Sequence, residues 1–343
     1  MQQRLQPLIA RCCLRKQGNF LVIKAVKEFV FDKNAPTPQC HASTVLPMPD
    51  KTTIAAWFGG TGEERDDVNI WVSRRSGGVW SEPVLVSADM NTPHWNPVLF
   101  AAADGTVLLF FKVGKKVPVW KTYVSKSRDG GLTWGNPREL VQGDESGGRG
   151  PVKNKPIRIS NGAILAPASV ESPHWIPFID ISTDECETWS NQPLILSKKR
   201  AGKPVPMIQP ALWESEPGKI HMLLRTSVRS AYRSDSDDYG KTWSRAYPTA
   251  VRNNNSGLDV TKLPDGSLIL ISNPVAKDQG VRAPLTLMIS RDNGAEWEEI
   301  FVLEKRRSSD DEFSYPAIVS VGRKLYITYT WQGTKIAYWE IEL

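Results

Sequence analysis

An eight-residue pattern of the form S-x-D-x-G-x-x-W returns along most of the chain at a nearly constant interval. Three copies are complete, at residues 127–134, 236–243 and 290–297, and two are degenerate, at residues 182–189 and 73–80. They end in Trp80, Trp134, Trp189, Trp243 and Trp297, which are 54 or 55 residues apart. A sequence period near 50 residues indicates an array of similar supersecondary units, so this spacing constrains the fold before any other feature.

The stretches between the copies have the composition of short strands. Apolar runs such as GAILAPASV (162–170) and KIHMLLRTS (219–227) are rich in Val, Ile and Leu and are bounded by turn residues. About four short strands per period, repeated around an axis, make the blades of a β-propeller. Five copies plus a closing unit at residues 313–343 predict an all-β, six-bladed β-propeller.

A strand around residues 20–32 is expected to complete the last blade. Residues 20–343 should therefore form a single domain, and residues 1–19 an N-terminal extension with little order. Within each copy of the pattern the Asp can accept backbone N–H groups, the Gly supplies a positive φ and the Trp wedges beneath the turn. We expect the copies on the rim of one face, between outer strands and away from any active site, with their tryptophans buried.

Composition excludes several classes of partner. The net charge of +6 includes only two short basic clusters, at residues 198–200 and 305–307, so we expect no nucleic-acid partner. No apolar run approaches 18 residues, so we expect no membrane span. The spacing of Cys12, Cys13, Cys40 and Cys186 fits neither a zinc site nor a disulfide framework, and we expect neither a metal nor a cofactor. Without a clear secretory signal, the default location is cytoplasmic. The modest positive charge suits a small anionic substrate.

The repeated pattern at this spacing is the Asp-box, or BNR repeat. Over residues 30–343 the chain resembles the sialidase (neuraminidase) superfamily of six-bladed propellers, in particular its BNR-repeat-like branch. In that superfamily three arginines bind the substrate carboxylate, an Asp is the acid/base, and a Tyr activated by a Glu is the nucleophile. The resemblance implies a carbohydrate-active protein whose partner is an acidic carbohydrate.

The resemblance can be followed residue by residue. It implies His41 in place of the first Arg, in CHASTVLPMPDKT, and Arg225 and Arg282 as the second and third. Gln209 stands in place of the Glu and is a candidate substrate-binding group. In FSYPAIVSVGR, Phe313 stands in place of the nucleophile. Tyr315 is the alternative nucleophile. Residues two apart on a strand face the same way, and a register shifted by two residues would also place Tyr315 at the family's nucleophile position.

Other segments rich in polar residues contain further candidate site residues. The loop FGGTGEERDD carries four carboxylates, of which Glu63 and Asp67 are the candidate acids, because crowding or burial raises a carboxyl pKa. His41 is a candidate acid/base near neutral pH. The Gly-rich segment GGRGPVKNKPI offers Arg149, Lys153 and Asn154 as substrate-binding groups, and RNNNSGLD offers Asn255. An exposed loop, a core His and ordinary Asn-rich turns are the structural alternatives.

Three functions follow from these residues. The first is a sialidase-like glycoside hydrolase acting on a terminal acidic sugar, a sialic or uronic acid, with Arg225 and Arg282 on its carboxylate. These two arginines are 57 residues apart, close to one period, and should occupy similar positions in successive blades. The second is a polysaccharide lyase in which His41 or Tyr315 takes a proton. The third is a non-catalytic glycan-binding propeller.

Overall fold

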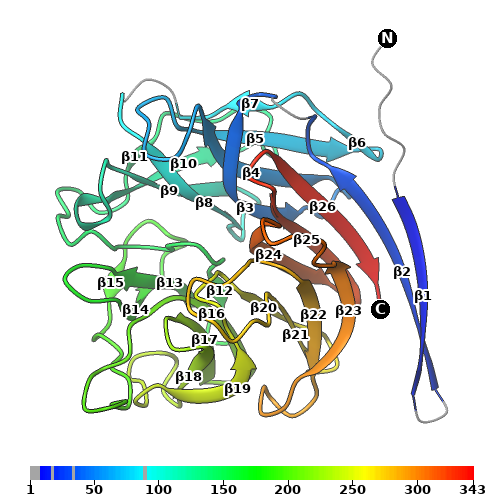
Figure 1. The fold of residues 1–343 in the computed structure, drawn as a ribbon. Helices are drawn as coiled ribbons and strands as arrows, with labels where there is room; N and C mark the ends of the chain where they lie inside the picture. Colours follow the sequence, from blue (N-terminus) through cyan, green and yellow to red (C-terminus); the bar gives the residue numbers. More distant parts are fainter. Residues whose placement is uncertain (1–7, 17–18, 33–34, 88–90) are drawn as a thin grey trace.

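The computed structural model describes residues 8–16, 19–32, 35–87 and 91–343 of the chain, and six antiparallel sheets in it surround a central axis (Figure 1). This confirms the prediction of an all-β, six-bladed propeller. In the described part of the chain the only helical element is a 3₁₀ turn, η1 (Val117–Val119). None of the described segments forms a helix long and apolar enough to cross a membrane.

Each blade is a sheet of consecutive strands, numbered from the axis outwards in blades one to five. Blade one contains β3 (Gln39–Pro47), β4 (Thr53–Gly60), β5 (Asn69–Ser76), β6 (Val79–Trp80) and β7 (Val84–Leu85). Blade two contains β8 (His94–Ala101), β9 (Val107–Val113), β10 (Lys121–Ser127) and β11 (Arg138–Glu139). Blade three contains β12 (Ile157–Arg158), β13 (Ile164–Val170), β14 (Ile176–Ser182) and β15 (Ser190–Asn191).

The remaining blades follow the same order. Blade four contains β16 (Met207–Glu216), β17 (Lys219–Thr226), β18 (Ser230–Ser236) and β19 (Tyr247–Arg252). Blade five contains β20 (Asp259–Lys262), β21 (Leu268–Ser272), β22 (Leu285–Ser290) and β23 (Glu298–Glu304). Blade six contains β24 (Phe313–Val321), β25 (Lys324–Trp331) and β26 (Lys335–Glu342), with β2 (Asn19–Phe29) and β1 (Leu8–Lys16) outside them.

The N-terminal strand closes the ring, as expected. β2 pairs antiparallel with β26, so the two ends of the chain share blade six. β1 lies in the segment expected to be an extension with little order, and it pairs along its whole length with β2. Figure 1 shows this hairpin at the periphery of the propeller, far from the axis.

The hydrophobic core is divided among the interfaces between blades. The described residues form six apolar clusters, and each joins strands of two neighbouring blades. The second strand of a blade is covered on both sides by its neighbours, which is why β4 and β9 are buried at every position. This explains why their sequences are mostly apolar and do not alternate as a half-exposed strand would, with Lys112 on β9 as their one charged residue.

The repeated pattern forms the turn between the third and fourth strands of a blade. In the copy of blade two, Ser127 Oγ donates to Asp129 Oδ1 at 2.8 Å, and the Gly131 amide donates to Ser127 Oγ at 2.8 Å. Backbone amides at 132 and 133 also donate to Asp129. The Thr133 hydroxyl donates to Asp129 as well, and this bond, followed by those from the Thr133 amide and the Ser127 hydroxyl, lowers the pKa of Asp129, since hydrogen bonds favour its charged form. The pattern is therefore a turn device, as the sequence indicates.

The expectation that the five tryptophans are buried is wrong, because they are only half-buried. Each packs its ring against the apolar cluster shared with the preceding blade, while its other face remains at the rim. Cys186, in place of a pattern Gly, has φ 71°, the same left-handed region that Gly131 occupies at 86°. Its thiol is buried in the cluster between blades two and three.

Antiparallel pairing places the turns of a blade alternately on the two faces of the propeller. Turns between first and second strands and between third and fourth strands share one face, which is the face of the repeated pattern. The starts of first strands and the turns between second and third strands lie on the opposite face. Side chains that converge there come from His41 on β3, Gln209 on β16 and Tyr315 on β24, among others.

Candidate active site

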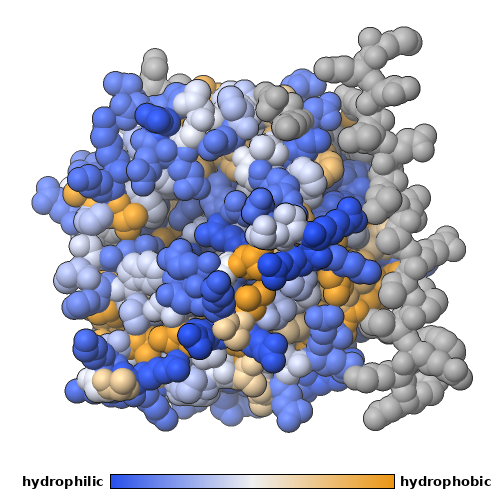
Figure 2. All heavy atoms as spheres, in the orientation of Figure 1, coloured by the Kyte–Doolittle hydropathy of each residue, from blue (hydrophilic) through white to orange (hydrophobic). Residues whose placement is uncertain are grey.

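Two cavities adjoin on the face opposite the repeated pattern. The inner cavity, of about 470 Å³, lies at the axis and is lined by the first strands of blades one, two, four and six and by loops around them. The outer cavity, of about 1000 Å³, lies between blades one, five and six. Both are lined by His41, Phe58, Glu63 and Arg282, which form a shared wall. Figure 2 shows a surface dominated by hydrophilic side chains with scattered hydrophobic ones.

Local irregularities in the first strands aim side chains at the inner cavity. The pairing register shifts between His41 and Thr44, Trp95 and Val98, Ile208 and Ala211, and Ser314 and Ala317. Within these bulges Asn96, Gln209 and Tyr315 have φ of 46°, 56° and 51°, although none is a glycine. A bulge re-aims a side chain, and left-handed backbone outside glycine persists only where the surroundings enforce it. All three residues line the inner cavity.

Tyr315, and not Phe313, reaches the site. Phe313 is 4% exposed and packs in the cluster between blades five and six. The two side chains do not share a face because the bulge at residues 315–316 breaks the alternation of the strand. Burial acts to raise the pKa of Tyr315, but the charges of Arg225 and Arg282, with hydrogen bonds from Gln209 and Arg225, outweigh it and lower that pKa.

Arg225 is a buried guanidinium whose hydrogen-bond partners are all neutral. It donates to Asn255 Oδ1 at 2.9 Å, to Gln209 Oε1 at 3.2 Å and to the Tyr315 hydroxyl at 2.8 Å. Its central carbon lies 5.5 Å from the ring centre of Trp175. No carboxylate of the described residues forms an ion pair with it. A buried cation without a counter-ion costs free energy, so this position favours binding of an anion.

Arg282 differs from Arg225 in position and partner. Its guanidinium forms an ion pair with Glu312 at 2.8 Å and lies 5.5 Å from the Tyr315 ring centre. The expectation of similar positions in successive blades is wrong: Arg225 is on β17, whereas Arg282 precedes β22. They converge because the end of a second strand and the start of a third strand lie on the same face.

His41 lies on the shared wall with its ring 4.4 Å from that of Tyr315. Burial, followed by the charges of Arg282, Arg225 and Lys153, holds the pKa of His41 well below its usual value. The imidazole is therefore neutral and adds no third positive charge to the two arginines. Neither ring nitrogen has a hydrogen-bond partner among the described residues, so both are available to a ligand.

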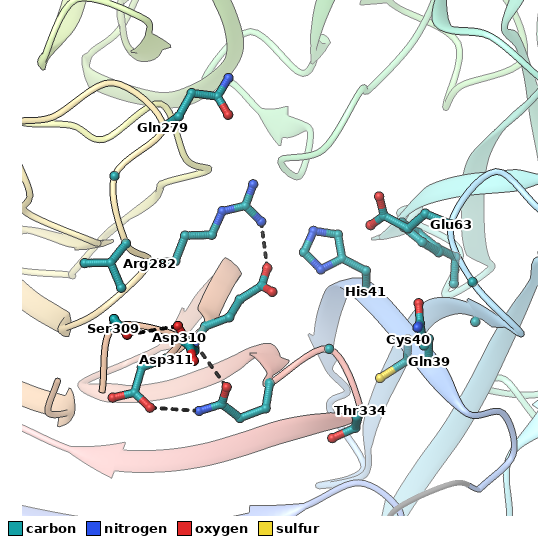
Figure 3. A pocket seen from close by; sticks show the side chains of 18 of the residues that line it. Gln39, Cys40, His41, Glu63, Gln279, Arg282, Ser309, Asp310, Asp311 and Thr334 are labelled. Carbon is teal, nitrogen blue, oxygen red and sulfur yellow. Dashed lines mark hydrogen bonds and ion pairs between the residues drawn. The ribbon is translucent and has the colours of Figure 1, made fainter. Parts of the chain in front are cut away.

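The acidic loop between β4 and β5 places only some of its carboxylates at the cavities. Glu63 lines both cavities, and Figure 3 shows its carboxylate directed into the same space as His41 and Arg282. Partial desolvation raises the pKa of Glu63, with Arg282 opposing and Glu312 and Glu64 adding to the rise. Asp67 lines neither cavity. It accepts hydrogen bonds from the amide and hydroxyl of Thr61 and thereby shapes the loop.

The Gly-rich cationic segment, GGRGPVKNKPI, fixes the backbone of residues that line the inner cavity. Lys153 is buried and donates to the carbonyl of Pro316, which follows Tyr315, and to Asn154 Oδ1. Asn154 donates to the carbonyls of Gln209 and Pro210, at 3.1 and 2.9 Å. Two residues that the sequence indicated as substrate ligands thus hold the bulges of Gln209 and Tyr315. Neither lines a cavity.

Two further candidate substrate-binding residues, Arg149 and Asn255, contact other residues of the protein instead of a cavity. Arg149 forms an ion pair with the buried Asp180 at 2.9 Å and lines neither cavity. Asn255 accepts from Arg225 and donates to Asp278 Oδ1 at 2.9 Å, so it orients the guanidinium rather than facing the cavity. Among the described residues no group of three or more His, Cys, Asp or Glu side chains is arranged to hold a metal ion.

Glu171 and Trp175 also line the inner cavity. Neither is among the site residues predicted from the sequence. Both lie in the turn between β13 and β14. Burial raises the pKa of Glu171, while Arg225 and Lys112 act in the opposite direction. The only signal in the sequence is a carboxylate directly after an apolar run, in ASVESPHW, followed by an aromatic side chain able to stack on a sugar.

The match to a known family covers most of this architecture. A model of the BNR repeat-like domain matches residues 51–327. The chain belongs to the BNR repeat-like domain family. No curated protein matches it. Solved structures with this fold include sialidases, which confirms the sialidase-like propeller predicted from the Asp-boxes.

Three of these structures show how far the likeness of this BNR repeat-like protein extends. A Dyadobacter fermentans protein of unknown function is 18% identical, with a TM-score of 0.70 over 89% of this chain and 95% of that one. The K499G mutant of NanB sialidase from Streptococcus pneumoniae is 11% identical, with a TM-score of 0.70 over 91% and 70%. The intramolecular trans-sialidase from Ruminococcus gnavus, in complex with oseltamivir carboxylate, is 13% identical, with a TM-score of 0.68 over 92% and 97%.

Proposed function

We propose that this protein is a glycoside hydrolase that removes a terminal acidic sugar, a sialic or uronic acid, from a glycan. The observation that carries the proposal is Arg225, a buried guanidinium with neutral partners beside a tyrosine of lowered pKa. A substrate carboxylate would supply the missing counter-charge, and the guanidinium of Arg282 lies near the ring of the same tyrosine. Folds of this type occur in sialidases, one of which is solved with oseltamivir carboxylate.

The proposed reaction has two steps. The Tyr315 phenolate attacks the anomeric carbon while the bond to the leaving oxygen breaks, and Glu63 gives its proton to that oxygen. Water then attacks the same carbon, Glu63 takes a proton from the water, and the phenolate leaves. Gln209 cannot act as a base, so ionisation of Tyr315 depends on the two guanidinium groups rather than on a partner carboxylate.

The pKa shifts at the site favour an enzyme over a binding module. A non-catalytic glycan-binding propeller needs cations and aromatic rings, but it needs no carboxyl of raised pKa beside a tyrosine of lowered pKa. Here Glu63 and Tyr315 are shifted towards each other, as an acid and a nucleophile at one centre require.

One observation favours a second candidate, a polysaccharide lyase. His41 is neutral, has unpartnered ring nitrogens and stands against Tyr315 beside two arginines. An imidazole in that state can take the proton from the carbon next to a bound uronate carboxylate. The carbon–oxygen bond beyond it then breaks, a double bond forms, and the leaving oxygen takes a proton from Glu63. The absence of a Glu at position 209 has no consequence for this reaction.

Incubation with acidic glycosides distinguishes the candidates. The substrates are 4-methylumbelliferyl glycosides of N-acetylneuraminic acid and glucuronic acid, together with uronic acid oligosaccharides. Hydrolysis releases the fluorophore and a free sugar, whereas a lyase forms an unsaturated product that absorbs in the near ultraviolet. Release of neither product, with binding of the sugars intact, would leave only the binding module.

Glu63→Gln supplies the internal check. A phenol-type leaving group needs little protonation, so the variant should retain most of its first-step rate on the fluorogenic glycoside. It should lose about 100-fold or more on a sugar leaving group, which needs the proton. Equal losses of rate on both substrates would show that Glu63 is not the acid.

A further inference from the structure

We infer a second catalytic centre, an esterase site formed by Ser215, His221 and Asp235, on the face of the propeller that carries the repeated pattern. The three side chains form a continuous series of hydrogen bonds: Ser215 Oγ lies 2.7 Å from His221 Nε2, and His221 Nδ1 lies 2.6 Å from Asp235 Oδ1. A hydroxyl, an imidazole and a carboxylate in this order are the parts of a serine nucleophile with its base. None of the three lines either cavity of the candidate active site, so the inference is independent of the proposed function.

The strand order of blade four brings the three residues together. Trp213 pairs with His221 and His221 pairs with Asp235, so side chains of β16, β17 and β18 lie next to one another on one face of the sheet. Ser215 is the extra residue of a bulge at the end of β16, next to the turn that leads into β17. A bulge re-aims a side chain, and this one directs the Ser215 hydroxyl towards the imidazole.

Asp235 is a charged carboxylate held by three side chains. Burial acts to raise its pKa, but hydrogen bonds from His221, Tyr247 and Arg233 outweigh this and lower the pKa of Asp235 to about 2. Tyr247 donates to Asp235 Oδ2 at 2.7 Å, and Arg233 Nε donates to Asp235 Oδ1 at 2.7 Å. These donors fix the carboxylate opposite His221 Nδ1.

The neighbours of His221 determine which ring nitrogen carries the proton. A charged carboxylate 2.6 Å from Nδ1 requires the proton on Nδ1, so Arg233 Nη2, which lies 2.9 Å from the same nitrogen, does not donate to it. Asn293 Nδ2 lies 3.1 Å from Nε2 and can donate only to a nitrogen without a proton. The Asn293 side-chain oxygen accepts from the Trp213 indole at 2.7 Å, which orients the amide. His221 Nε2 is therefore the unprotonated nitrogen that a base for Ser215 needs.

Ser215 lies where a substrate can approach from solvent. It is half-buried, whereas His221 is 7% exposed and packs against Trp213, whose ring centre lies 5.3 Å from that of the imidazole. Lys262 donates to the backbone carbonyl of Ser215 at 3.0 Å and forms no ion pair among the described residues. Lys262 Nζ and Asn293 Nδ2 are therefore two donors beside Ser215 for the negative charge that develops on an attacked carbonyl oxygen.

The proposed reaction is the hydrolysis of an ester. Ser215 Oγ attacks the carbonyl carbon and His221 Nε2 takes its proton; the bond to the alcohol oxygen then breaks, and that oxygen takes the proton from Nε2. Water attacks the acyl carbon, Nε2 takes a proton from the water, the bond to Oγ breaks and Oγ takes the proton back. Ester and water become acid and alcohol, with no further reactant. Because Trp213 and Arg233 pack against the imidazole, we expect a short acyl group, such as acetyl.

The test uses p-nitrophenyl acetate as the ester and a fluorophosphonate as the covalent probe of the serine. The phosphorus of the probe is attacked in place of a carbonyl carbon, fluoride leaves, and the label stays on Oγ, where mass spectrometry of peptides locates it. The variants are Ser215→Ala and Asp235→Asn. The matched control is Ser76→Ala, which removes the hydroxyl of an exposed serine at the end of β5. Thermal unfolding shows whether each variant is folded.

The wild type should take up one fluorophosphonate per chain, on Ser215, and should turn over p-nitrophenyl acetate. Ser215→Ala should lose the label and at least about 100-fold of the turnover rate, because the nucleophile is gone. Asp235→Asn should lose at least about tenfold of the rates of labelling and turnover, because the imidazole loses the carboxylate that holds its proton on Nδ1. Ser76→Ala should change neither rate.

A label on another residue, turnover that survives in Ser215→Ala, or a wild type that is neither labelled nor active overturns the inference. A folded Asp235→Asn protein with full activity overturns it too, since the carboxylate would then have no part in the reaction. If Asp235→Asn does not fold, Ser215→Ala alone decides. Equal rates on p-nitrophenyl octanoate and p-nitrophenyl acetate would contradict the short acyl group.

Discussion

The hydroxyl of Tyr315 accepts a hydrogen bond from Arg225 Nη1 at 2.8 Å, across 90 residues of sequence. This contact joins blade six to blade four at the axis. It places the one phenol of the inner cavity against a cation that has no carboxylate partner in the described chain. The positive charge of Arg225 therefore stabilises both the Tyr315 phenolate and a bound substrate carboxylate.

Tyr315→Phe removes the hydroxyl while leaving the ring in contact with His41 and near both arginines. Hydrolysis of a fluorogenic sialoside or glucuronide should fall by at least about 100-fold, because the covalent step loses its nucleophile. Affinity for the free acidic sugar should change little. Steady-state rates with a parallel titration of the monosaccharide check both parts. Activity within a few-fold of wild type would assign the nucleophile to another group.

Arg225→Lys keeps the charge but loses the planar arrangement of donors. Binding of an acidic monosaccharide should weaken by about 1–3 kcal/mol, the order of one charge-assisted hydrogen bond. Because no carboxylate of the described residues forms an ion pair with Arg225, the midpoint of thermal unfolding should not fall. Arg282→Lys is the companion variant: it should weaken binding similarly, and its ion pair with Glu312 can re-form. An unfolded Arg225→Lys protein, with normal affinity in the folded fraction, would make this arginine structural.

The fold could be predicted from the sequence because one physical device repeats. Each turn needs an acceptor, a left-handed residue and an apolar anchor, and these leave a pattern that survives even where Cys186 replaces the glycine. The burial of the tryptophans could not be predicted, since it depends on how far each blade overlaps its neighbour. Spacing alone also placed Arg225 and Arg282 in equivalent positions, although one belongs to a second strand and the other to a loop.

The site could be predicted in part. The resemblance to sialidases indicated Arg225, Arg282, Gln209 and His41, and all four line the inner cavity. Sequence cannot show a bulge, and the bulge in β24 separates Tyr315 from Phe313. Nor can it show where a buried cation points. Lys153 and Asn154 turn towards backbone carbonyls of blades six and four, 163 and 55 residues away.

Gly131→Ala tests the repeated pattern against a matched glycine. Gly131 has φ 86°, and a Cβ there would lie 2.8 Å from Ile54 Cδ1 of the preceding blade. Gly105 has φ 85° with open space around the same position. Left-handed backbone should cost both alanine variants about 1–2 kcal/mol, and the contact with Ile54 should cost Gly131→Ala about 1–3 kcal/mol more.

Urea unfolding measures both values. Rates on the fluorogenic substrate should stay unchanged in both variants, because the pattern and the cavities lie on opposite faces. A loss of activity in Gly131→Ala without a comparable loss of stability would connect the pattern to the site. Equal stabilities for the two variants would show that the contact between blades yields without cost.

Lys112 should make the stability of the fold depend on pH. Its side chain is fully buried and donates to Thr122 Oγ1 at 2.7 Å and to the Arg149 carbonyl at 2.6 Å. Burial lowers the pKa of Lys112 to about 7, although Asp180, Asp144 and Glu171 act against this, whereas the value for the unfolded chain is about 10.5. Between these values the unfolded state binds more protons than the folded state, so stability rises with pH. Below pH 7 both states are protonated, and the cost of burying the charge is fully present.

Lys112→Met removes this titration and keeps a side chain of similar length. The free energy of unfolding of the wild type, relative to the variant, should rise by on the order of a few kcal/mol between pH 7 and 10 and stay level between pH 6 and 7. Lys153, whose pKa burial likewise lowers to about 7, is present in both proteins and cancels from the difference. Urea unfolding at half-unit pH steps measures the two curves. Parallel curves across this range would mean that Lys112 stays protonated in the fold, held by the carboxylates around it.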